Sequence, residues 1–261
     1  MRRLAAAVAM LLSVSGPAQA GAWTLDQNKV QVFTGMTAST AARRFDNGGA
    51  ASQKIIFRKL LFQNWTEFGL TDAVTLFVAP EYVMAKSGTP TTGVGSVSSM
   101  SLEGGVRILL LSRIGMLSVQ GSAKSAGAFD MSTSSSGESG RQFEARLLYG
   151  RSFKVLKRDG FFDLEAAERW IARPRPDEFA FDATAGWWLT PDYLVLVQSF
   201  NVMTAGGVKP PYEPYRLHKL QFSLVSPVTK RWSIQSGYFF SIAGRNIVKE
   251  TGVVTTFWYK T

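Results

Sequence analysis

The chain has 261 residues and a net charge of +10 at neutral pH, with no cysteine and one histidine. These counts exclude disulfides, thiol nucleophiles and metal sites rich in cysteine or histidine, and we expect no metal and no cofactor. A basic chain suits anionic surfaces such as lipopolysaccharide or nucleic acid, and the export signal described next argues against nucleic acid.

The first twenty residues have the pattern of a secretory signal peptide. Arg2 and Arg3 form a positive head, residues 4–14 are apolar apart from Ser13, and residues 18–20 (Ala-Gln-Ala) provide the small-x-small pattern at which signal peptidase cuts. The apolar run is too short to span a bilayer as a helix. We therefore expect residues 1–20 to be removed, leaving a mature domain of residues 21–261 in the bacterial envelope.

Beyond residue 20 the apolar residues alternate with polar ones, which is the pattern of strands with two unlike faces. No run of eighteen apolar residues remains, so transmembrane helices are not expected. Twelve strands are predicted, several of them long enough to cross a bilayer at a tilt. They span residues 28–40, 54–70, 73–86, 98–111, 116–126, 141–153, 160–172, 177–189, 193–202, 215–225, 231–243 and 246–259.

The connections between these strands alternate in length. Tight turns are predicted at residues 71–72, 112–115, 190–192 and 226–230. Long loops are predicted at residues 41–53, 87–97, 127–140 and 203–214. Short turns on one side and long loops on the other are typical of an outer-membrane barrel, although residues 173–176 and 244–245 would then be short outer loops. The prediction is an antiparallel transmembrane β-barrel of about twelve strands, with ten strands or a soluble periplasmic sandwich as alternatives.

Aromatic residues near the predicted strand ends suggest the interfacial girdles of such a barrel. Two features fit this less simply. Pro80 lies within a strand and calls for a bulge, and the strand at 54–70 is polar on both faces, so its facing is open. The girdle candidates are Trp65, Trp170, Trp187, Trp188, Trp232, Trp258, Tyr149, Tyr193, Tyr215 and Tyr259.

In a barrel the apolar face meets lipid and the charged face lines the lumen. Ile108, Leu147, Phe181 and Phe222 are predicted to touch lipid. Acids outnumber bases by two to one among the predicted lumen residues, so a conducting lumen would prefer cations. The predicted lumen set is Glu81, Glu103, Arg107, Lys124, Glu144, Arg146, Asp163, Glu165, Arg169, Glu178, Asp182 and Glu250.

The same charges could instead pair across strands and close the lumen. Glu103 with Arg107, Glu144 with Arg146, and Asp163 or Glu165 with Arg169 are placed for such pairing. The sequence therefore leaves a channel and a non-conducting barrel both open.

An enzyme is a more distant alternative. His218 is the only possible imidazole base, but alternation puts it on the same lipid-facing side of its strand as Leu220. A hydrolase would need a serine two residues along that face, and Leu220 occupies the position. Pairs of acids such as Glu178 with Asp182 have the composition of a glycosidase site, but they are also common in barrel lumens. We expect no enzyme and no catalytic residue.

Several segments resemble the XagA-type family of bacterial envelope proteins. They include GAWTLDQNKVQV at the expected mature start, EFGLTDAVTLFVAPEY (67–82), EARLLYGRSF (144–153), GFFDLEAAERW (160–170), PDEFAFDATAGWWL (176–189), LVLVQSF (194–200) and the ending FWYK. This resemblance implies an outer-membrane component associated with exopolysaccharide and biofilm gene clusters, with a role in passing or retaining a surface polysaccharide. It implies no catalytic residue.

The expectation from sequence is thus a porin-like outer-membrane barrel of a Gram-negative envelope. It would act as a channel or export component, with a surface polysaccharide as the candidate solute. A structural or adhesive barrel that presents long outer loops is the alternative, and a lipid-modifying enzyme is the third. The expected partners are outer-membrane lipid, lipopolysaccharide and a polysaccharide export system, with no nucleic acid.

Overall fold

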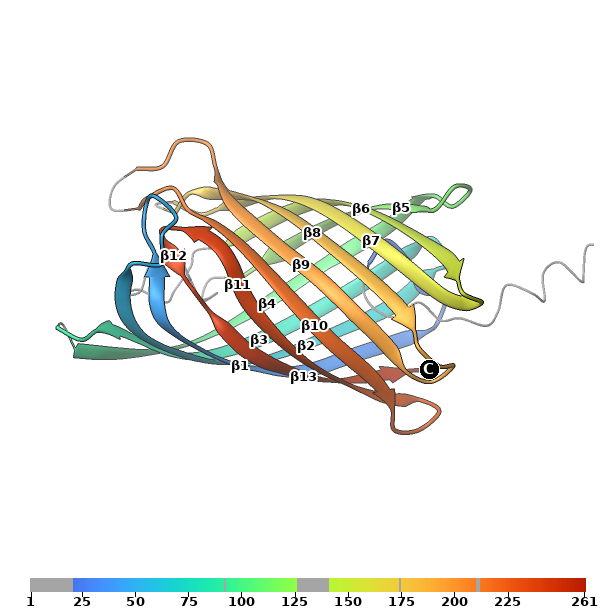
Figure 1. Ribbon diagram of the computed structural model, residues 1–261. Helices are drawn as coiled ribbons and strands as arrows, with labels where there is room; N and C mark the ends of the chain where they lie inside the picture. Colours follow the sequence, from blue (N-terminus) through green and yellow to red (C-terminus); the bar gives the residue numbers. More distant parts are fainter. Residues whose placement is uncertain (1–20, 92, 126–140, 174, 210–211) are drawn as a thin grey trace, which may run out of the picture.

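The computed structural model describes residues 21–91, 93–125, 141–173, 175–209 and 212–261, so the expected signal peptide lies outside the described residues. The described chain forms one antiparallel sheet closed into a barrel, which confirms the predicted all-β fold (Figure 1). The strands are β1 (Val30–Phe45), β2 (Gln53–Thr71), β3 (Val74–Thr89), β4 (Gly93–Leu111), β5 (Met116–Lys124), β6 (Gln142–Val155), β7 (Arg158–Ile171), β8 (Asp177–Trp188), β9 (Leu194–Ala205), β10 (Arg216–Pro227), β11 (Trp232–Arg245), β12 (Ile247–Val248) and β13 (Thr251–Lys260).

The barrel closes because β1 pairs along its length with both β2 and β13. The two-residue β12 pairs only with Arg44 and Phe45 at the end of β1, so the barrel has twelve long strands, as predicted. Both the start of β1 and the end of β13 lie at one end, which we call the terminal end, and the opposite one is the loop end (Figure 1). The described residues hold no helix long and apolar enough to span a membrane.

Two of the predicted long loops are wrong because the strands run further than expected. β1 continues to Phe45 and β2 begins at Gln53, and β3 and β4 form a hairpin that extends past the loop end (Figure 1). The predicted loop at residues 127–140 lies outside the described residues. In the turn after β1, Asp46 accepts hydrogen bonds from the side chain of Ser52 and from the backbone of Ala50 and Gly48, and these bonds lower the pKa of Asp46.

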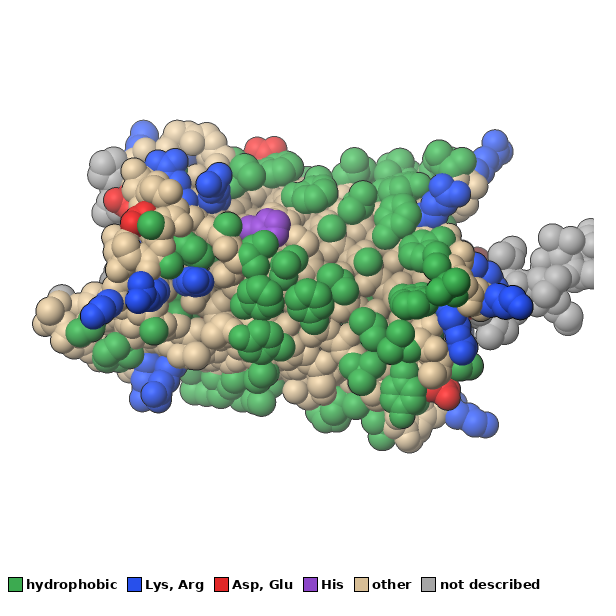
Figure 2. All heavy atoms as spheres, in the orientation of Figure 1, with side chains coloured by type: hydrophobic (Ala, Val, Ile, Leu, Met, Phe, Trp, Pro, Cys, Tyr) green, Lys and Arg blue, Asp and Glu red, His purple; other side chains and the backbone are tan. Residues whose placement is uncertain are grey.

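The outer surface is apolar where the predicted strands present their apolar faces. Ile108, Leu147, Phe181 and Phe222 are each at least 40% exposed, on the outside of the barrel. Figure 2 shows hydrophobic side chains over the middle of the barrel and lysine and arginine side chains gathered at its two ends. This is the distribution expected of a barrel in a bilayer. Glu168 on β7 is an acidic residue that is exposed on this outer surface.

Pro80 does not cause the predicted bulge. The pairing of β2 with β3 stops after Gln63↔Glu81 and resumes at Thr66↔Val78 in the same register, so a short unpaired gap accommodates the missing N–H group. The facing of β2 is now clear: Lys59 and Glu67 are buried and point inward, whereas Phe62 is exposed outside.

The predicted aromatic girdle is only partly correct. Trp170, Trp187, Trp232 and Tyr193 are exposed on the outside. Four of the predicted girdle residues point into the barrel instead, because the neighbours of a strand residue alternate between faces. These are Trp65, Trp188, Trp258 and Tyr215.

The facing of β8 leads to a direct test. Phe181→Arg is expected to destabilise the barrel by roughly 2–4 kcal/mol in lipid, because it places a charge on the outer apolar surface. Thr184→Arg on the same strand is the control, because Thr184 lines the interior and should tolerate the charge. Urea unfolding in lipid vesicles measures both, and equal losses would contradict the assigned facing.

Candidate functional site in the barrel lumen

The barrel encloses a cavity of about 660 Å³ that runs from Gly21 and Trp23 near the terminal end to Tyr215 and Ile247 near the loop end. All predicted lumen residues lie inside the barrel. Eleven of them line the cavity, and Glu250 is buried against its wall with 2% exposure. Their placement follows from the strand alternation, and their role in transport stays a prediction.

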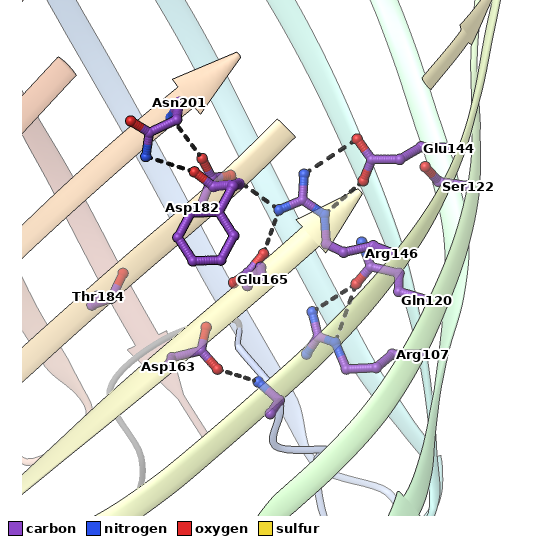
Figure 3. Close-up of polar contacts among 12 residues, drawn as sticks. Arg107, Gln120, Ser122, Glu144, Arg146, Asp163, Glu165, Asp182, Thr184 and Asn201 are labelled. Atoms are coloured by element: carbon purple, nitrogen blue, oxygen red, sulfur yellow. Dashed lines mark hydrogen bonds and ion pairs between the residues drawn. The ribbon is translucent and has the colours of Figure 1, made fainter. Parts of the chain in front are cut away.

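Arg146 is the centre of the largest charge network. Its guanidinium pairs with Glu144 at 2.7 Å, with Asp182 at 3.1 Å and with Glu165 (Figure 3). Arg169 extends the network, pairing with Glu144 at 2.6 Å and with Glu178 at 3.2 Å. The predicted pair of Glu144 with Arg146 is confirmed, whereas Arg169 pairs with neither Asp163 nor Glu165.

Glu178 continues this network toward the loop end. It pairs with Arg175 at 3.3 Å and accepts a hydrogen bond from the Tyr215 hydroxyl. The charges thus form a chain across the inner wall from β6 to β8, and it continues through Glu178 to Tyr215, the residue before β10.

Arg107 forms a second network near the terminal end and is 1% exposed. It donates to Glu67 at 2.9 Å, to Gln120 at 3.1 Å and to the backbone carbonyl of Trp23 at 3.1 Å. Glu67 also accepts from the Trp65 indole at 2.9 Å. The predicted pairing of Arg107 with Glu103 is therefore wrong, and Glu103 instead accepts from Ser122 at 2.7 Å.

Two further groups lie on the inner wall. Glu250 pairs with Lys59 at 2.6 Å and with Lys219 at 2.9 Å, and it accepts from Ser39 at 2.5 Å. Lys124 on β5 pairs with Glu81 on β3 at 3.3 Å, across the intervening strand β4.

The charge of the cavity lining differs from the prediction. Lys59, Arg175 and Lys219 were not predicted to line the lumen, and they raise the number of lining bases to match the lining acids. The acids that line the cavity are Glu81, Glu103, Glu144, Asp163, Glu165, Glu178 and Asp182, and the bases are Lys59, Arg107, Lys124, Arg146, Arg169, Arg175 and Lys219. The lining is balanced in formal charge, so the expected twofold excess of acids is not present.

Residues 21–29, which precede β1, enter the barrel at the terminal end; we call them the N-terminal segment. Its backbone is held by side chains of the inner wall. The Ala22 N–H donates to Asp163 at 2.9 Å, Ser118 donates to the Ala22 carbonyl at 2.5 Å, and the Leu25 N–H donates to Thr75 at 2.8 Å. The N-terminal segment could not be predicted from the sequence, because a non-repeating run of nine residues has no periodicity to mark it.

Two glycines make room for the N-terminal segment. A Cβ atom at Gly69 would lie 2.1 Å from the Asp26 carbonyl oxygen, and one at Gly150 would lie 2.6 Å from the Trp23 ring. Glycine at these positions permits the close approach of the segment to β2 and β6.

Aromatic and aliphatic side chains pack inside the barrel near the terminal end, and Trp23 of the N-terminal segment packs against them. Trp23 packs edge-on against Phe161, with ring centroids 5.8 Å apart, and Phe33 packs edge-on against Trp258 at 5.4 Å. The buried members of this cluster are Phe33, Phe161, Leu194, Leu196, Val225 and Trp258. This cluster and the N-terminal segment together occupy part of the lumen at the terminal end.

The geometry places no nucleophile directly opposite the single histidine. The single histidine lies on the outer surface (Figure 2), and the cross-strand neighbours of His218 are Asn201 and Ala243, neither of which is a nucleophile. Among the described residues no cluster of His, Asp or Glu has the arrangement of a metal site.

The closed twelve-strand sheet, the apolar exterior and the polar interior define the fold of the bacterial outer-membrane β-barrels. Among solved structures, the chain is similar to the COG4313 outer membrane channel from Pseudomonas putida F1, with a TM-score of 0.69 and 12% identity over 94% of this chain and all of that one.

Two further solved structures are similar over nearly the whole chain. The translocator domain of the autotransporter NalP from Neisseria meningitidis has a TM-score of 0.58 and 12% identity, covering 100% of this chain and 94% of that one. The NanC porin has a TM-score of 0.53 and 10% identity, covering 89% and 100%. No family model and no curated protein matches the sequence. At these identities the likeness establishes the fold.

Proposed function

We propose that the protein is a porin-like channel of the Gram-negative outer membrane, closed in this conformation by its own N-terminal segment. The observation that carries the proposal is the polar cavity of about 660 Å³ along the barrel. A volume of this size is typical of sites that hold small molecules, whereas a purely structural barrel of this width would fill its interior with side chains. The terminal end then faces the periplasm and the loop end faces outward.

The balanced lining favours neutral or zwitterionic polar solutes over ions of one sign. Carboxylates and guanidinium groups that already pair with each other still offer hydrogen-bond donors and acceptors to a solute. Because their charges cancel, they neither attract nor repel ions of one sign. Aromatic rings at the terminal end add flat apolar faces. Sugars combine hydroxyl groups with apolar faces and fit such a lining.

A surface polysaccharide is the proposed cargo class, on the strength of the resemblance to XagA-type proteins together with this lining. A polymer could pass only after the N-terminal segment leaves the lumen, which makes an export system and lipopolysaccharide the proposed partners. The N-terminal segment is then the element that such a partner would displace.

Deleting residues 21–27 tests the channel. The wild-type protein in planar bilayers is expected to conduct weakly, and the deletion variant is expected to conduct strongly, because the contacts to Ser118, Asp163 and Arg107 are lost. The reversal potential of the variant in a salt gradient should lie near zero, because the lining acids and bases are equal in number. Liposome swelling with sugars of increasing size then measures the limit of passage.

A non-conducting structural barrel is the second candidate, and the dense pairing around Arg146 favours it. Absence of current from both the wild type and the deletion variant, with both folded, would establish this candidate and reject the channel.

A further inference from the structure

We propose that cleavage after Ala20 creates a positively charged terminal amine on Gly21 that pairs with Asp163 and fixes the N-terminal segment inside the barrel. The barrel thereby contains a binding site for its own processed end. The proposal rests on the expected signal-peptide cleavage and on the position of Gly21, and it does not require that the barrel conduct.

The geometry places Gly21 directly against the Asp163 carboxyl group. A Cβ atom built on Gly21 would lie 2.9 Å from both Cγ and Oδ1 of Asp163 and 3.0 Å from Oδ2. The next backbone nitrogen, that of Ala22, donates to Asp163 Oδ1 at 2.9 Å, as the dashed line to Asp163 in Figure 3 shows. A terminal ammonium on Gly21 therefore lies within reach of the same carboxyl group.

Asp163 is a buried carboxyl group with no direct ion pair among the described residues. It is 3% exposed, and among the described residues no lysine or arginine pairs with it. Its neighbours are already engaged: Arg107 pairs with Glu67, and Glu165, on the same face of β7, pairs with Arg146. The charge of Arg107 acts on Asp163 without an ion pair between them, and Glu165 lies within hydrogen-bonding reach of Asp163. A buried carboxylate with no direct ion pair is costly, and a terminal ammonium would supply both a directly paired charge and N–H donors.

The site is also shaped for a small end of chain. Gly21 and Ala22 are both buried, and a side chain at position 21 would require the Asp163 carboxyl group to shift. An uncleaved chain would place an uncharged peptide nitrogen at this point and would have to route twenty more residues away from it. A processed end would therefore add a charged pair with Asp163 that an unprocessed chain lacks.

Protection of the terminal amine provides the test. Protein purified from outer membranes is first checked by mass spectrometry for a start at Gly21, and is then treated near neutral pH with an amine-reactive ester. An α-amine, with an ordinary pKa of about 8, reacts faster than lysine there. Folded wild-type protein should label at Gly21 about tenfold or more slowly than urea-unfolded protein, because each unit rise in amine pKa lowers the reactive fraction tenfold.

Asp163→Asn is the decisive variant, and it should label at Gly21 in the folded state much faster than the wild type. Asp159→Asn is the matched control on the same strand, because Asp159 pairs with Lys154 on the exposed hairpin and should leave the labelling unchanged. Heat-modified mobility on gels confirms that each variant is folded, and if Asp163→Asn does not fold, Gly21→Val takes its place with the same expected gain in labelling.

A different mature start, rapid labelling of folded wild type, or equal protection in the wild type and the Asp163 variant would each overturn the proposal. Because labelling needs no current, failure of this test is separate from failure of the channel test.

Discussion

Replacing Arg146 with Met is expected to destabilise the folded barrel by about 3–5 kcal/mol, because removing one partner of a buried ion pair leaves the others uncompensated. Here the loss is concentrated, since Arg146 pairs with three carboxylates, Glu144, Glu165 and Asp182, all largely buried. Urea unfolding in detergent or lipid, followed by tryptophan fluorescence, measures the change.

Lys154→Met on the same strand is the control for this prediction. Lys154 pairs with Asp159, but both side chains are exposed, at 76% and 43%, and such a pair contributes about 0–1 kcal/mol. Adding Glu165→Gln to the Arg146 variant should recover part of the loss, because it neutralises one of the stranded carboxylates. Equal losses for Arg146→Met and Lys154→Met would show that the inner network does not stabilise the barrel.

The second large effect is expected at Arg107, which joins the inner wall to the N-terminal segment. Arg107→Ala removes the bond to the Trp23 carbonyl, and a hydrogen bond to a charged group contributes about 1.5–3 kcal/mol. The undocked population of the segment should therefore rise about tenfold or more. Planar-bilayer recordings should show this as a larger or more frequently open current.

Arg107→Ala also leaves the Glu67 carboxylate buried without its ion-pair partner. The effect on barrel stability must therefore be separated from the effect on docking of the N-terminal segment. Glu67→Gln alone leaves the bond between Arg107 and Trp23 in place and should not raise the current. The double variant Arg107→Ala/Glu67→Gln removes the stranded carboxylate, so it should regain stability and keep the raised current. A current that follows stability rather than the loss of the Trp23 bond would contradict the assigned role of Arg107.

The sequence was sufficient for the strands and their facing where charged and apolar residues alternate without exception. Ile108 and Arg107 illustrate this, because adjacent residues of a strand must point to opposite faces. The charge balance of the lumen could not be obtained in this way. Arg58 and Lys59 are neighbours in a strand that is polar on both faces, and only the pairing of Lys59 with Glu250 shows which one points inward.

The lumen aromatics and the N-terminal segment were missed for a different physical reason. Trp187 and Trp188 are adjacent and look alike in sequence, yet Trp187 is exposed outside whereas Trp188 packs inside against the cluster around Phe161. Contacts of this kind join residues far apart in the chain. The bond between Ala22 and Asp163 spans 141 positions, and local patterns carry no information about it.

The contacts of the N-terminal segment have a consequence for the order of biogenesis. Among the described residues, every wall residue that donates to or accepts from its backbone belongs to a strand between β2 and β7 or to the turn between β2 and β3. These residues are Gly69, Asp72, Thr75, Arg107, Ser118 and Asp163. A nascent sheet of the first seven strands therefore already contains all of these hydrogen-bonding partners of the segment. Joining β1 to β13 then encircles an end that is already in place, so the last step of insertion need not thread it through a finished ring.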